Sequence, residues 1–163
     1  MNATGSTGTT VTLFGSSDPI DLALSDQLGK RGCKTHFVSV PTGWLRSASH
    51  AVMRLDTEAG AEAFKELADT RQPRSHVIAV CPETADAAES DRVRDMCRAC
   101  GRHHDVSLIW HPPLDGDGAA RHSARTTVTT NALAATVADE MVEHTSVGQP
   151  SFVTRPFLEA GPH

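Results

Sequence analysis

Short apolar segments alternate with longer amphipathic segments along most of this 163-residue chain. Runs of apolar and β-branched residues between turn residues predict strands, whereas apolar residues that recur every three or four positions predict helices. Such runs predict five strands: Thr10–Phe14, Lys34–Val40, Ser75–Cys81, Val106–Trp110 and Phe152–Thr154. Because helices separate these strands, the pattern predicts an α/β protein with a parallel sheet that is covered on both faces.

Four helices are predicted from their apolar faces. The first follows the turn after Phe14 and places Ile20, Leu24 and Leu28 on one face. The inward faces of the other three are Ala59, Phe64, Leu67 and Ala68; Val93, Met96, Cys97 and Cys100; and Leu133, Val137 and Met141. Gly101 stands just past the third helix, where glycine commonly ends a helix.

Composition narrows the classes of function. The formal net charge of −5 leaves no basic surplus for phosphate contacts, so a nucleic-acid partner is not expected. Residues 1–10 are small and polar, which predicts a mobile N-terminal tail before one domain from 11 to 163. No segment reaches the roughly 18 apolar residues of a membrane span, and the four cysteines lack the spacing of a secreted disulfide framework. A cytoplasmic location is therefore expected.

The turn Gly15-Ser16-Ser17-Asp18-Pro19-Ile20-Asp21 carries the most chemical information. It joins a buried strand to a helix, which is where a dinucleotide-binding fold holds a pyrophosphate on the helix N-terminus. Asp18 can instead cap that helix, with Pro19 at the first helical position and Asp21 in the first turn. Two unit charges about 4 Å apart repel by roughly 4 kcal/mol at an effective dielectric near 20, so the turn favours a helix start over a phosphate site.

Five segments follow one another at a characteristic spacing: the turn at Gly15; Leu55-Asp56-Thr57 before a helix; Val77-Ile78-Ala79-Val80; Ser107-Leu108-Ile109-Trp110; and Arg155-Pro156-Phe157 with Ala160-Gly161-Pro162. Together they resemble the nucleotide-binding part of the extended short-chain dehydrogenase/reductases, the NAD-dependent epimerase/dehydratase family. The resemblance covers residues 11–163 and makes Val77–Val80 a fourth strand and Ser107–Trp110 a fifth. It implies a Rossmann-like doubly wound sheet in which Gly15, Ser16, Ser17 and Asp56 would contact NAD or NADP if a nucleotide binds.

The chain departs from this family's pattern at the positions that carry its chemistry. Asp18 and Asp21 stand where the family's Gly-x-x-Gly-x-x-Gly loop has its second and third glycines, and Val40-Pro41 offers no charge to a ribose. The chain has no tyrosine, and Ala132 and Thr136 match the positions of the family's catalytic tyrosine and lysine. The chain stops at 163, before the family's C-terminal substrate lobe. No cofactor is therefore favoured, although the resemblance leaves NAD or NADP open.

His111 is the candidate catalytic base, because it stands at the carboxyl end of a central strand, which is where open α/β sheets place their sites. Trp110 beside it could line a pocket, and Asp115 could orient its ring. A structural or solvent-facing histidine is the competing interpretation. Asp115 lies in a Gly- and Asp-rich stretch that is typical of a solvated loop.

Cys97 and Cys100, followed by His103 and His104, contain the residue types of a zinc site. Zinc sites of this kind separate their two ligand pairs by about a dozen residues, whereas here the pairs are almost contiguous. Both cysteines also share the apolar helix face, which favours buried thiols. No metal site is predicted.

Three functions remain open from the sequence. The first is a non-catalytic relative of the dehydrogenase family that binds a partner, either in a homo-oligomer or in a hetero-oligomer with a full-length relative. The second is a cofactor-independent isomerase, dehydratase or cyclase that uses His111 as a base on a small molecule. The third is an NAD(P)-dependent epimerase or reductase that holds its cofactor in a shifted pose.

Overall fold

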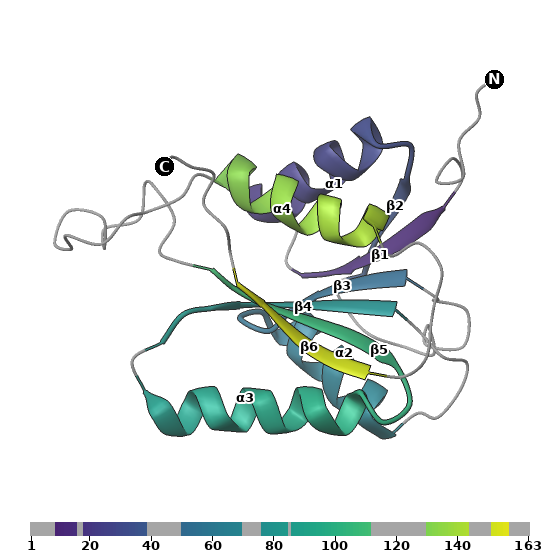
Figure 1. Cartoon of the computed structure of the whole chain (residues 1–163). Helices are drawn as coiled ribbons and strands as arrows, with labels where there is room; N and C mark the ends of the chain where they lie inside the picture. The colour runs from purple at the N-terminus through teal and green to yellow at the C-terminus, as the bar shows by residue number, and fades with distance from the viewer. Residues whose placement is uncertain are drawn as a thin grey trace, which may run out of the picture.

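A computed structural model describes residues 9–15, 18–38, 50–69, 76–84, 86–111, 130–143 and 151–156. Strands and helices alternate along them (Figure 1): β1 (Thr10–Phe14), α1 (Pro19–Lys30), β2 (Lys34–Val38), β3 (His50–Arg54), α2 (Glu58–Asp69), β4 (His76–Pro82), α3 (Ala87–Cys100), β5 (Asp105–His111), α4 (Thr130–Glu143) and β6 (Ser151–Pro156). The predictions made for residues 1–8, Ser16, Ser17, Val40-Pro41, Asp115 and the chain from 157 onward lie outside these residues. None of the described helices is long and apolar enough to cross a membrane.

The six strands form one parallel sheet in the order β2-β1-β3-β4-β5-β6. Helices α1 and α4 cover one face of the sheet, and α2 and α3 cover the other (Figure 1). This arrangement confirms the predicted α/β class and its Rossmann-like, doubly wound architecture. Within it, β2 and β3 lie on opposite sides of β1, so the winding direction changes there. The first five strands thus follow the 2-1-3-4-5 order, not the 3-2-1-4-5-6 order of the dinucleotide-binding fold.

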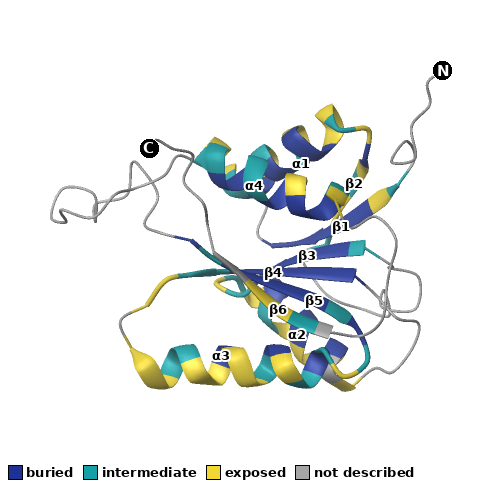
Figure 2. Cartoon of the chain, in the orientation of Figure 1, coloured by how far each residue is buried: buried dark blue, intermediate teal, exposed yellow. Residues whose placement is uncertain are grey.

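The central strands are buried on both faces, as their continuous apolar runs predict (Figure 2). In β4, Ile78 and Val80 pack with the α1 and α4 side chains, whereas Val77 and Ala79 pack with those of α2 and α3. All four of these residues are at most 2% exposed. The sheet therefore separates two apolar layers that together form the core.

Most predicted elements are confirmed, with shifts at their ends. β1 matches Thr10–Phe14 and begins one residue before the expected domain boundary, while β4 and β5 each extend one residue past their predicted ends. β3 was missing from the pattern-based prediction, although the resemblance implied a third strand. Its sequence, His-Ala-Val-Met-Arg, has only three apolar residues between two polar ends, which is too short a run to distinguish from a loop.

Candidate functional site

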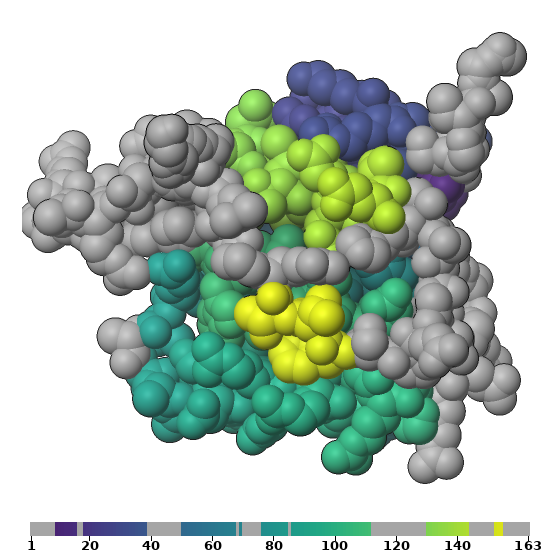
Figure 3. Space-filling model, in the orientation of Figure 1, coloured from purple at the N-terminus to yellow at the C-terminus, as the bar shows by residue number. Residues whose placement is uncertain are grey.

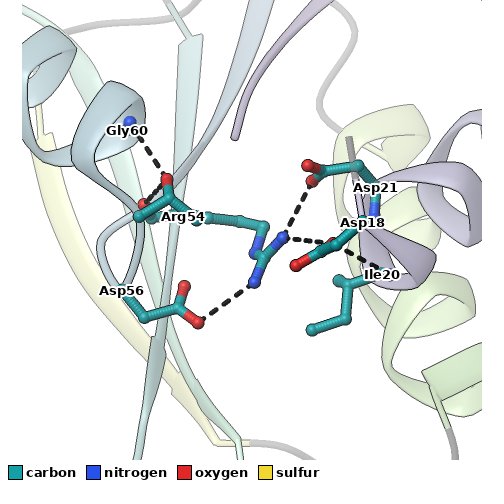
Figure 4. A network of polar contacts seen from close by, with 7 residues as sticks. Asp18, Ile20, Asp21, Arg54, Asp56 and Gly60 are labelled. Atoms are coloured by element: carbon teal, nitrogen blue, oxygen red, sulfur yellow. Dashed lines mark hydrogen bonds and ion pairs between the residues drawn. The ribbon is translucent and has the colours of Figure 1, made fainter. Parts of the chain in front are cut away.

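The change of winding direction places the carboxyl ends of β1 and β3 side by side. In open α/β sheets, the crevice outside this point is the usual place for a ligand. Here charged side chains meet from both sides of it (Figure 4). Asp18 and Asp21 come from the start of α1, Arg54 is the last residue of β3, and Asp56 follows in the turn before α2.

Arg54 joins these carboxylates. Its Nη1 donates to Asp18 Oδ1 at 2.6 Å and to Asp21 Oδ1 at 3.2 Å, and its Nη2 donates to Asp56 Oδ2 at 3.0 Å (Figure 4). The side chains of Arg54 and Asp21 are 4% and 1% exposed, whereas those of Asp18 and Asp56 are about one-third exposed. One guanidinium thus ties the first turn of α1 to the β3–α2 turn through a partly buried network.

The predicted role of Asp18 as a helix cap is confirmed. Its Oδ1 accepts hydrogen bonds from the backbone N–H groups of Ile20 and Asp21 at 3.1 and 3.2 Å, and Pro19 is the first helical residue. The same oxygen accepts from Arg54. Two N–H groups that a phosphate would use at a helix N-terminus are therefore already bonded to a carboxylate of the chain itself.

The charges of the network favour the ionised form of Arg54. Burial opposes its charge, but the hydrogen bond to Asp18 and the charges of Asp56 and Asp21 outweigh burial, so the pKa of Arg54 is raised above its ordinary value. Three carboxylates contact this one guanidinium. The sequence analysis counted only the negative charges of Asp18 and Asp21. In the structure, Arg54 offsets part of this charge and Asp56 adds to it.

Two glycines allow these elements to approach closely. A Cβ on Gly15 would lie 2.6 Å from Asp21 Oδ1, so the glycine after β1 leaves room for that buried carboxylate. A Cβ on Gly60 would collide with the backbone of Arg54, whose nitrogen would be 2.7 Å away. Thr57 reinforces this second approach, since its hydroxyl donates to the Arg54 carbonyl at 2.8 Å and accepts from Gly60 N at 3.1 Å.

The sequence suggested that Trp110 could line a pocket beside His111, but these neighbouring residues of β5 face opposite sides of the sheet. Trp110 packs with the α2 and α3 layer, and the Arg94 guanidinium lies 5.6 Å from the centre of its ring. As the next residue along β5, His111 directs its side chain to the opposite face of the sheet. His111 is only 5% exposed, and its carbonyl accepts from Glu83 N at 2.9 Å. The partner proposed for it, Asp115, lies outside the described residues.

The interpretation of Cys97 and Cys100 as buried thiols is confirmed, because both are fully buried against the sheet. Burial raises the pKa of Cys97, and it raises the pKa of Cys100 to about 12. Cys81, at the end of β4, is partly exposed, and burial followed by the charge of Asp56 raises its pKa to about 11. In the part of the chain that the structure describes, no three histidine, cysteine or acidic side chains are grouped to hold a metal.

Arg54 is the central residue of the site, and motif reasoning overlooked it. The available signal was indirect: Asp18 and Asp21 lie three positions apart at the start of a helix, so a buried Asp21 requires a counter-charge from elsewhere in the fold.

The chain was compared with models of known protein families and with curated proteins, and none of them matches the chain. The resemblance to the short-chain dehydrogenase/reductases thus stays a prediction.

Proposed function

We propose that this protein is a non-catalytic, Rossmann-like domain that acts by associating with a partner subunit. The observation that carries this proposal is the Arg54 network at the change of winding direction. In a nucleotide-binding protein this crevice must be open to phosphates. Here the Arg54 guanidinium of the chain itself lies at this point and pairs with three carboxylates.

Two features of the network oppose a dinucleotide in the usual pose. Asp18 already accepts from the N–H groups of Ile20 and Asp21, so a pyrophosphate would have to displace it. The network also places three carboxylates at this point, and each unit negative charge about 4 Å from a phosphate charge costs roughly 4 kcal/mol at an effective dielectric near 20. A helix N-terminus contributes at most about 2 kcal/mol toward binding an anion, which is too little to compensate.

The residues that match the family's catalytic pair support a non-catalytic role. Ala132 and Thr136 both lie on α4. Thr136 Oγ1 donates to the Ala132 carbonyl at 3.0 Å, within the same helix. An alanine and a hydroxyl bonded to its own helix cannot perform the proton transfer of a tyrosine and a lysine.

The buried His111 gives less support to the alternative of a cofactor-independent enzyme. A general base must reach the proton that it abstracts, and 5% exposure leaves little of the His111 side chain accessible. The four free cysteines agree with the proposed cytoplasmic location, because reduced thiols are typical of that compartment.

Thermal unfolding with NAD, NADH, NADP and NADPH tests the proposal. A ligand at 100 times its dissociation constant stabilises a protein by about 2.7 kcal/mol. For a chain of this length, that corresponds to a rise in Tm of roughly 5–11 °C. We expect no such rise with any of the four. A rise with one of them would show an open nucleotide site and overturn the proposal.

A further inference from the structure

We draw no further inference here: the strongest candidate, a groove of about 260 Å³ that Leu55, Val93 and Met96 line between α2 and α3 (α3 is the teal surface at the bottom of Figure 3), has both of its cations, Lys65 and Arg92, already paired with Glu62 and Glu89, and nothing in the structure shows what covers it.

Discussion

Replacing Arg54 by methionine tests whether the ion-pair network stabilises the fold. Methionine keeps most of the side-chain volume but removes the charge that faces Asp21, whose side chain is 1% exposed. Removing one partner of a buried ion pair leaves an uncompensated charge and costs about 3–5 kcal/mol. At 2–4 °C for each kcal/mol in a chain of this length, Tm should fall by roughly 6–20 °C.

Urea denaturation followed by circular dichroism measures this loss directly. Arg98→Met is the matched control, because Arg98 pairs with Asp95 at 2.9 Å but both side chains are more than 60% exposed. Exposed pairs contribute at most about 1 kcal/mol, so this control should change stability little.

A further measurement tests whether the loss of the Arg54 charge beside Asp21 is the cause. The double variant Arg54→Met with Asp21→Asn should be more stable than Arg54→Met alone, since it also removes the buried negative charge of Asp21 that Arg54 faces in the wild type. If Arg54→Met costs no more than Arg98→Met, the stabilising role assigned to the network is refuted.

Three smaller predictions follow from the same structure. Gly60→Ala should destabilise the protein by more than 1 kcal/mol in urea denaturation, because its Cβ would collide with the β3 backbone, whereas Gly29→Ala on α1, which meets open space, should stabilise it by about 0.4–1 kcal/mol. Equal effects of the two substitutions would contradict this. Thr57→Ala should cost about 1 kcal/mol through the lost hydroxyl bonds at the start of α2, and an unchanged denaturation midpoint would argue against that role. A thiol reagent should modify folded protein slowly at neutral pH and faster as pH rises toward the pKa of Cys81, about 11, with Cys81 ahead of the fully buried Cys97; mass spectrometry of the labelled peptides would show the order.

Local sequence predicted the features of the fold that depend on local energetics. The run Val77-Ile78-Ala79-Val80 is apolar at every position because both of its faces are covered, and that pattern is readable without tertiary knowledge. The cap at Asp18 was readable for the same reason, since a side chain that accepts from N–H groups two and three positions ahead is a local contact.

The features that escaped prediction depend on contacts between distant segments. Arg54 lies 36 positions from Asp18, and no spacing rule connects an arginine at a strand end to a helix cap that far away. Placing β3 beside β1 required the same long-range information, because β2 precedes it in the chain. The site was therefore half predictable: the carboxylates at the start of α1 were found, but the cation that binds them was not.

The position of β3 also has a consequence for synthesis on the ribosome. β3 lies on the other side of β1 from β2. After β3, each later strand pairs with the strand that precedes it in the chain, in the order β4, β5 and β6. When the domain folds, no strand made later has to insert between strands made earlier. All four residues of the Arg54 network precede β4 in the chain, so they have been translated before β5 and β6 are made.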